Sequence, residues 1–296
     1  MQTLVIGLGS MGFGAAVSCV RANIQIAGFD VNPDALERFK AEGGQPIHSL
    51  NACQNIDCVL IFVVNAAQAE SVLFDSNLLA GLNPNALVIN RVTLSPSKAV
   101  DIANKVQAQG FRYIDAPVSG GAAKALEGRM SIMASGAPDA MADAKPVFDA
   151  ISEHVFELGD KPGGGSQMKL INQLLAGVHI AAAAEAMNLA ASLEMDLHQV
   201  IDVISKCAGS SWMFENRAPH IADGDYTPLS SVNIFVKDLG IVTDEASGND
   251  VATPLSEAAL ALYRQASEEG LGGEDDSAVV KILAQQSNVT LPGSNT

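Results

Sequence analysis

The chain opens with Thr3-Leu4-Val5-Ile6-Gly7-Leu8-Gly9-Ser10-Met11-Gly12, in which a short apolar run leads directly into three spaced glycines. The apolar run predicts a buried strand, and the glycines predict a tight turn that opens a helix. The N-terminus of such a helix presents free backbone N–H groups and a positive dipole end to a pyrophosphate. Gly7 permits the turn, Gly9 lets the backbone approach the phosphates, and Gly12 lets the helix pack close to the strand.

A second predicted strand, Ile24–Phe29, ends beside Asp30, about twenty residues after the glycines. An acidic side chain at this spacing accepts hydrogen bonds from a dinucleotide ribose and repels a 2′-phosphate. The sequence therefore predicts NAD rather than NADP as the cofactor. The alternative is that Asp30 caps the helix that starts at Asn32-Pro33.

The composition is that of a folded protein large enough for two domains. The 296 residues are 48% hydrophobic and carry a formal net charge of −16. A strongly acidic surface argues against binding to nucleic acid or to an anionic membrane, and an acidic substrate then needs a local cationic pocket. The four cysteines (Cys19, Cys53, Cys58 and Cys207) lack metal-ligand spacing. They indicate reduced core residues of a cytoplasmic protein without a metal site.

The first half of the chain alternates short apolar strands with amphipathic helices, which predicts a doubly wound, mostly parallel sheet. A glycine-rich break at 159–165 ends this alternation. One long helix, running from Ser166 as its N-cap to about Leu193, and a helical remainder follow. We therefore predict an α/β dinucleotide-binding domain over 1–162 and an all-helical domain over 163–296. The predicted strands are Thr3–Ile6, Ile24–Phe29, Cys58–Val64, Leu87–Asn90, Arg112–Asp115, Ser131–Ala134 and Val155–Leu158.

The stretch Asp115-Ala116-Pro117-Val118-Ser119-Gly120-Gly121 follows a predicted strand, so it lies on the ligand side of the sheet. The two glycines can expose backbone N–H groups as an anion-binding nest, and Ser119 adds a hydroxyl. An ordinary strand-to-helix loop is the alternative.

Lys169 falls in the first turn of the predicted long helix, and Gln173 shares its face. A cation there opposes the helix dipole, so its presence favours a functional explanation. A neutral amine is a competent general base. The alternative is a lysine that extends its ammonium group into solvent.

Lys237 and Asp238 lie inside an otherwise apolar helical stretch, 233–239. Adjacent residues do not face each other on a helix, so we expect each to have its own partner, such as the cofactor or the other domain. A solvated polar face is the alternative. The lone Trp212 and His179 are expected to be packing residues.

Four motifs resemble the β-hydroxyacid dehydrogenase family in their order and spacing. They are the glycine turn, the Asp115–Gly121 stretch, the glycine-rich approach to Lys169, and Lys237-Asp238-Leu239. The resemblance implies an NAD-dependent enzyme with an N-terminal Rossmann domain, a long interdomain helix and an all-helical C-terminal domain. It also implies a homo-oligomer, dimer or tetramer, and makes Lys169 the catalytic residue. The implied cofactor-binding residues are Gly7, Leu8, Gly9, Ser10, Met11, Gly12, Asp30, Val64, Asn65, Thr93 and Lys237, and the implied substrate-binding residues are Ser119, Gly120, Gly121, Asn172 and Gln173.

Further stretches are similar to the branch of that family that acts on L-threonate, namely 64–68, 173–180, 211–217 and 223–228. They imply a small anionic sugar acid as substrate, oxidised at the hydroxyl beside its carboxylate. The alternatives are a tartronate semialdehyde reductase, a 3-hydroxyisobutyrate dehydrogenase and a non-catalytic NAD-binding sensor. Two positions depart from the family pattern: Gln173 replaces Asn, and Val92 replaces a frequent Ser. Arg91 is also unexpected.

Overall fold

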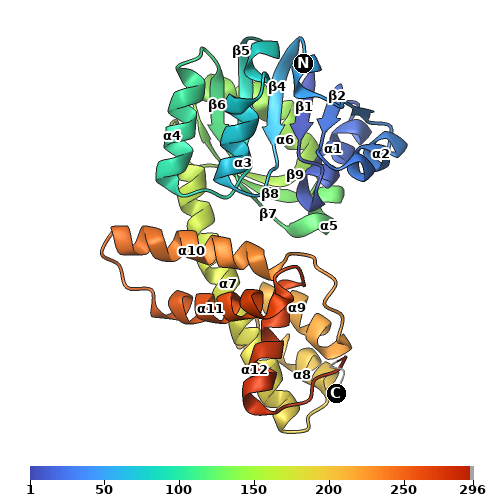
Figure 1. The fold of residues 1–296 in the computed structure, drawn as a ribbon, viewed down its shortest axis with the longest axis vertical. Helices are drawn as coiled ribbons and strands as arrows, with labels where there is room; N and C mark the ends of the chain where they lie inside the picture. The colour runs from blue at the N-terminus through green and yellow to red at the C-terminus, as the bar shows by residue number, and fades with distance from the viewer. Residues whose placement is uncertain (294–296) are drawn as a thin grey trace. The chain divides into compact units, whose positions relative to one another are not determined.

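The structure, a computed structural model, describes residues 1–293 and forms two compact units, Met1–Lys169 and Leu170–Thr296. The first unit is a sheet with helices on both faces, and the second is helical (Figure 1). The predicted α/β class, the parallel sheet and the helical C-terminal region are confirmed. The predicted domain border at residue 162 stays a prediction.

The strands of the described residues form one sheet in the order β3-β2-β1-β4-β5-β6-β8-β7, with β9 paired to β8. Pairing is parallel from β3 to β6 and between β8 and β9, whereas β8 is antiparallel to β6 and β7. Chain order reverses at β1, which is where doubly wound sheets bind dinucleotides. The strands are β1 (Thr3–Ile6), β2 (Ile26–Phe29), β3 (Gln45–Pro46), β4 (Ile56–Ile61), β5 (Leu82–Asn90), β6 (Arg112–Asp115), β7 (Val118–Ser119), β8 (Met130–Gly136) and β9 (Ser152–Glu157).

The central strands are apolar on both faces because helices cover both. On β4, Leu60 packs into one core, while Val59 and Ile61 pack into the other. This alternation explains why the strand reads as an unbroken apolar run. The helices of the first unit are α1 (Ser10–Arg21), α2 (Pro33–Ala41), α3 (Ala66–Glu70), α4 (Pro96–Gln107), α5 (Gly121–Leu126) and α6 (Pro138–Ile151), with short turns η1 (Leu50–Ala52), η2 (Ser71–Asp75) and η3 (Leu79–Gly81).

The second unit packs its helices around α7, which starts in the first unit. Ile180, Ala184 and Met187 of α7 are buried in a core shared with α9 to α12. In residues 1–293, α7 is the one helix long and apolar enough to span a membrane, and 44% of its most apolar window is already buried in protein. The helices are α7 (Gly164–Ser192), α8 (Leu197–Ile204), α9 (Trp212–Asp223), α10 (Val232–Gly248), α11 (Pro254–Ala266) and α12 (Val279–Ser287), with short turns η4 (Ser267–Leu271) and η5 (Asp276–Ala278).

Several predictions of burial and capping were wrong. Trp212, expected in the core, is 53% exposed because it begins α9 at the surface. Cys207 is exposed, unlike the other three cysteines. Ser166 does not cap α7, because the helix already begins at Gly164. The sequence pattern also did not indicate the two-residue strands β3 and β7.

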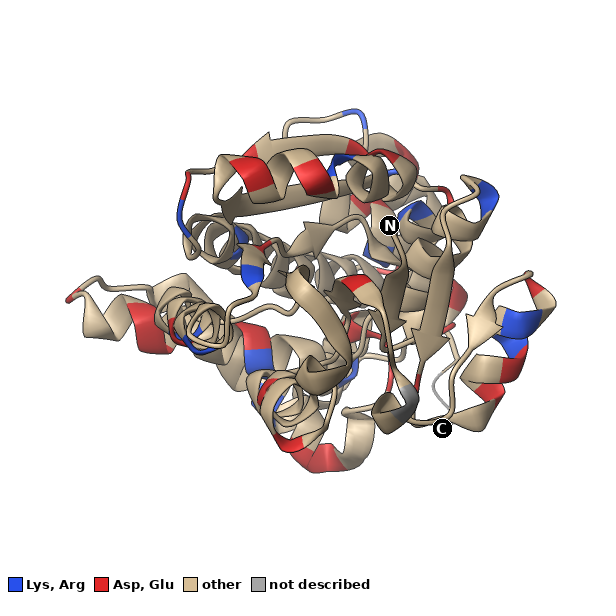
Figure 2. Ribbon diagram, turned by 90° about the horizontal axis from the view of Figure 1, so that it is seen from above, with Lys and Arg blue, Asp and Glu red and all other residues tan. Residues whose placement is uncertain are grey.

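Acidic residues, red in Figure 2, lie on many separate helices and loops.

Candidate functional site

The glycine turn between β1 and α1 depends on two glycines for its own packing. Gly7 has a φ of +92°, and a Cβ there would lie 2.4 Å from the carbonyl oxygen of Phe62. A Cβ on Gly12 would lie 1.8 Å from the carbonyl oxygen of Gly7. Neither distance is sterically allowed, so the turn itself requires both residues.

Gly9 is different, because nothing in the protein requires a glycine there. Its φ is −72°, and an added Cβ would have no atom within 4 Å. Gly9 is the N-cap of α1 and supplies no capping side chain, so the first N–H groups of the helix have neither an intrahelical acceptor nor a side-chain cap. A Cβ would fill the open space at Gly9, which fits the close approach of a pyrophosphate.

A cavity of about 380 Å³ adjoins this helix start and is lined by both backbone and side chains. Arg38 of α2 lies over the Phe13 ring, with its guanidinium carbon 5.0 Å from the ring centroid. Leu8 is buried and Met11 half-buried against the core, so these two offer backbone rather than side chain. The lining residues are Gly9, Ser10, Phe13, Gly14, Arg38, Ala122 and Leu126.

Asp30 directly follows β2, beside this turn. Its carboxylate accepts hydrogen bonds from the backbone N–H of Leu8 at 2.6 Å and of Asn32 at 2.8 Å. Asn32, not Asp30, caps α2, through a hydrogen bond from the N–H of Asp34. Because each carboxylate oxygen can accept a second bond, Asp30 can still receive ribose hydroxyls.

The loops after β4 and β5 hold the next three predicted cofactor residues. Asn65 caps α3 by accepting the N–H of Gln68, whose side chain in turn accepts the N–H of the exposed Val64. Thr93 is half-buried between the buried Val92 and Leu94. The two hydrogen bonds order the loop after β4, and burial of Val92 and Leu94 anchors the loop after β5.

The Ser119 loop joins β7 to α5 and has left-handed backbone at both of its glycines. Ser119 ends β7, and Gly120 and Gly121 follow with φ values of +133° and +75°. A Cβ on Gly121 would meet nothing within 4 Å, so this backbone is open. Such a turn can present consecutive N–H groups to an anion.

Asp115, at the end of β6, organises the start of α7. It is fully buried and accepts hydrogen bonds from the N–H of Gly163 at 3.1 Å, the N–H of Ser166 at 2.8 Å and the hydroxyl of Ser166 at 2.8 Å. Burial raises the pKa of Asp115, and these hydrogen bonds oppose that effect. Lys169 follows one turn later and is 7% exposed.

In the second unit, four polar side chains form one chain of contacts. Asn172 donates to Gln173 at 2.8 Å, and Gln173 donates to Asp238 at 2.5 Å. Asp238 also pairs with Lys237, Nζ to Oδ1 at 2.5 Å. Our expectation of separate partners for Lys237 and Asp238 was therefore wrong, because a long lysine side chain can fold back to a buried neighbour.

Arg91, which had no explanation in the sequence, lies in the core of the first unit. It is 4% exposed, with its guanidinium carbon 4.9 Å from the Phe148 ring centroid and 5.7 Å from that of Phe62. Its Nη1 donates to the carbonyl oxygen of Ala116 at 3.4 Å, whereas its Nε and Nη2 have no acceptor among the described residues. Burial lowers its pKa to about 9.

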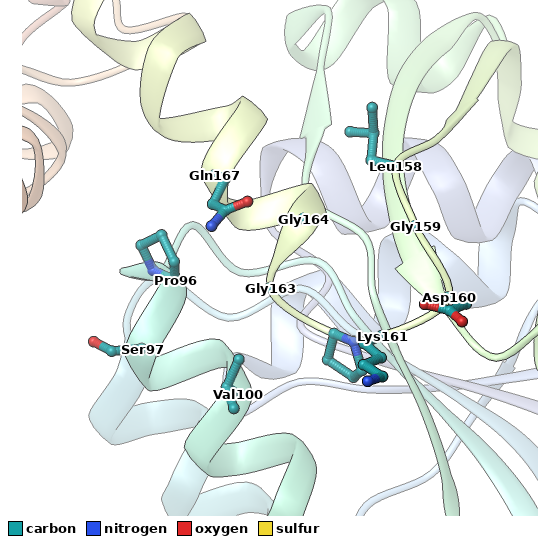
Figure 3. Close-up of a pocket in the computed structure, with 11 residues that line it drawn as sticks. Pro96, Ser97, Val100, Leu158, Gly159, Asp160, Lys161, Gly163, Gly164 and Gln167 are labelled. Atoms are coloured by element: carbon teal, nitrogen blue, oxygen red, sulfur yellow. The ribbon is translucent and has the colours of Figure 1, made fainter.

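A separate cavity of about 610 Å³ lies where α4 meets the loop that leads into α7 (Figure 3). None of the predicted site residues lines it. Its polar side chains, from Ser97, Asp160, Lys161 and Gln167, are exposed. In residues 1–293 no group of three or more His, Cys, Asp or Glu is placed to hold a metal ion.

Comparison with known proteins decides the family. A family model for the NAD binding domain of 6-phosphogluconate dehydrogenase matches residues 2–159. A second, described as NAD-binding of NADP-dependent 3-hydroxyisobutyrate dehydrogenase, matches residues 163–283. The chain belongs to the β-hydroxyacid dehydrogenase family. It is thus an oxidoreductase of CH–OH groups that uses a nicotinamide cofactor, as the sequence predicted.

Relatives within the β-hydroxyacid dehydrogenase family match nearly end to end. L-threonate dehydrogenase from Cupriavidus necator is 50% identical over 98% of this chain and 97% of its own. That from Haemophilus influenzae is 48% identical over 97% and 96%. The crystal structure of a 3-hydroxyisobutyrate dehydrogenase from Salmonella typhimurium has a TM-score of 0.91 at 48% identity, covering 95% of this chain and 99% of that one.

Proposed function

We propose that the protein oxidises L-threonate with NAD, at the hydroxyl beside the carboxylate, to give the 2-oxo acid. The observation that carries this proposal is the near end-to-end identity of 46 to 50% to proteins named L-threonate dehydrogenase. The preference for NAD over NADP is part of the proposal and is supported by the position of Asp30 at the end of β2.

In this proposal the first unit holds the cofactor and the reacting carbon. The backbone of Gly7–Gly12 binds the pyrophosphate, Asp30 the ribose, and Val64, Asn65 and Thr93 the remainder of the dinucleotide. The N–H groups of Ser119, Gly120 and Gly121 bind the substrate carboxylate. The roles that the family resemblance implies for Asn172, Gln173 and Lys237 remain predictions.

Lys169 acts as the general base. The bound nicotinamide supplies the hydride acceptor. Lys169 takes the hydroxyl proton of the substrate, and in the reverse direction its protonated amine polarises the carbonyl. Burial of Lys169 keeps bulk water away from this proton transfer. Much of the rate comes from holding the reacting groups in near-attack contact.

The test is a panel of hydroxy acids incubated with NAD, followed by NADH absorbance. Selective turnover of L-threonate supports the proposal. Lys169→Ala should then keep NAD affinity and lose about two to four orders of magnitude in turnover. Turnover near that of the wild type in this variant removes the assigned role of Lys169.

A second candidate is 3-hydroxyisobutyrate oxidation, because the solved structure of that name is 48% identical. Selective turnover of 3-hydroxyisobutyrate in the same panel would identify a 3-hydroxyisobutyrate dehydrogenase. Reduction of tartronate semialdehyde with NADH would identify a tartronate semialdehyde reductase. NAD binding without turnover decides for a sensor. We also propose a cytoplasmic homo-oligomer, which sedimentation equilibrium and cell fractionation can test.

A further inference from the structure

We propose that Asp115 is a positioning residue that holds the turn carrying Lys169 in register with the Ser119–Gly121 loop. The inference rests on the proposed function, in which Lys169 is the base and that loop binds the carboxylate. Asp115 touches neither substrate nor cofactor in this account. It acts by fixing the distance between two groups that must meet the same substrate.

The start of α7 has no cap of its own. The carbonyl of Gly163 accepts the first helical hydrogen bond, from the N–H of Gln167. Gly163 has no side chain that could cap the helix (Figure 3). The carboxylate of Asp115, 51 residues earlier than Ser166 in the chain, takes over the cap. It accepts the N–H of Gly163 and both the N–H and the hydroxyl of Ser166.

A second contact holds the same turn. The N–H of Gly165 donates to the hydroxyl of Ser135 at 2.9 Å, and Ser135 also hydrogen-bonds to Asp115. A Cβ on Gly165 would lie 2.3 Å from the carbonyl oxygen of Met133 and 2.7 Å from that of Asp115. The helix start therefore lies directly on the backbone of β6 and β8.

Asp115 links the two halves of the proposed site through very short stretches of chain. Ser119 lies four positions after Asp115, and Ser166, which Asp115 caps, lies three positions before Lys169. A carboxylate suits the task because all of its lone pairs accept. Both backbone N–H groups bond to Oδ2, and Oδ1 meets only the Ser166 hydroxyl, so an Asn amide could keep these contacts with its oxygen in place of Oδ2. Only removal of the whole carboxylate abolishes the cap.

The decisive variant is Asp115→Ala in the full chain, which removes all three contacts of the carboxylate. We expect kcat for L-threonate to fall about 100-fold, since a shift of about 1 Å in a reacting group costs that much. The Kd for NAD and the KM should stay within about threefold, because neither binding surface is altered. The primary deuterium isotope effect on kcat, measured with substrate deuterated at the oxidised carbon, should rise, because the chemical step becomes slower than product release.

Two further variants separate positioning from folding. Val59→Ala removes buried volume from the middle of β4 and lowers stability, but it should leave kcat per folded molecule and the isotope effect unchanged. Ser166→Ala removes only the hydroxyl contact and should show a smaller drop in kcat, about threefold to tenfold, with a smaller rise in the isotope effect. If Asp115→Ala does not fold, Ser166→Ala carries the test.

The inference is overturned if Asp115→Ala lowers the melting temperature but keeps kcat and the isotope effect of the wild type. A loss of NAD affinity in this variant overturns it too, since it assigns Asp115 to the cofactor site. Failure of the proposed function looks different: Lys169→Ala then stays active, or the wild type does not turn over L-threonate.

Discussion

The carboxylate of Asp30 accepts the backbone N–H of Leu8 at 2.6 Å, which ties the end of β2 to the glycine turn after β1. The sequence offered a ribose contact and a helix cap as alternatives for Asp30. The structure gives the cap to Asn32 and leaves Asp30 to order the turn. An ordered carboxylate at this edge repels a 2′-phosphate, because neither group can move away from the other.

Asp30→Arg should shift cofactor preference toward NADP. The substitution removes the repulsion and adds a cation that can pair with a 2′-phosphate. We expect the NAD-to-NADP ratio of kcat/KM to fall at least about tenfold, equivalent to about 1.4 kcal/mol. Asp34→Arg is the matched control, since it makes the same charge change at an exposed position of α2. Equal effects of both variants refute the ribose assignment.

Gly9→Ala and Gly12→Ala should separate cofactor binding from folding. A Cβ at Gly9 meets no protein atom within 4 Å, so this variant should lose less than about 1 kcal/mol of stability. It should nevertheless bind NAD at least about tenfold more weakly, because the methyl group occupies the space of the pyrophosphate.

Gly12→Ala should behave in the opposite sense. Its Cβ would lie 1.8 Å from the oxygen of Gly7, so the loss of stability itself should be large. Isothermal titration with NAD and urea unfolding measure the two effects. Normal NAD affinity in a folded Gly9→Ala protein contradicts the proposed cradle.

The sequence predicted those features that depend on spacing and local pattern. Three spaced glycines after an apolar strand, and Asp30 at the end of the next, follow from the geometry of a doubly wound sheet. The long helix and the helical second unit follow from the loss of strand pattern after the break at 159–165.

Contacts between distant or flexible side chains could not be predicted. The cap of α7 comes from Asp115, 51 residues away from Ser166, which no local pattern reveals. The pair between Lys237 and Asp238 forms because a lysine has enough rotatable bonds to reach back along its own helix. Arg91 and Phe148 meet only after the sheet and α6 are assembled.

Gln173→Asn, which restores the amide usual in the family, should destabilise this chain. The shorter side chain loses about 1.5 Å of reach, so it cannot contact both Asn172 and Asp238. Asp238 is 2% exposed and would keep only Lys237 as a partner. We expect the free energy of unfolding in urea to fall by about 1–3 kcal/mol. Gln167→Asn, on the exposed face of α7, should change it little; an equal loss there speaks against the network.

Arg91→Met should stabilise the first unit. Burial lowers the pKa of Arg91 to about 9, which measures how unfavourable its buried charge is, and at pH 7 the guanidinium is still protonated. The neighbouring Cys19 and Cys58 offer no negative charge, because burial raises the pKa of each thiol to about 12. Methionine fills similar space without a charge, so the free energy of unfolding should rise by about 1–3 kcal/mol.

The exposed Arg21→Met serves as the comparison for Arg91 and should change stability by no more than about 0.5 kcal/mol. A loss of stability in Arg91→Met means that the contacts with the Phe62 and Phe148 rings outweigh the desolvation of the charge. Urea unfolding at pH 7 decides between these outcomes.

Asp276 should make the helical unit less stable as pH rises from 4.5 to 6.5. Burial raises the pKa of Asp276 to about 6, and the nearby Asp275 adds to this effect. The ion pair with Arg217, which Asp275 also contacts, opposes it. A carboxyl whose folded pKa exceeds its unfolded value of about 3.9 stabilises the fold below that value and loses the contribution as pH rises through the folded pKa.

Across this window the Asp276 contribution should decrease by roughly 2 kcal/mol. Carboxyls with lowered pKa values, such as Asp57 and Glu70 beside their hydrogen-bond partners, contribute with the opposite sign, mainly below this window. The measurement is therefore the difference in unfolding free energy between wild type and Asp276→Asn at each pH, in which those contributions cancel. Between pH 4.5 and 6.5 the unfolding free energy of the wild type should fall relative to that of Asp276→Asn. A constant difference means that Asp276 stays ionised throughout and that Arg217 fully compensates its burial.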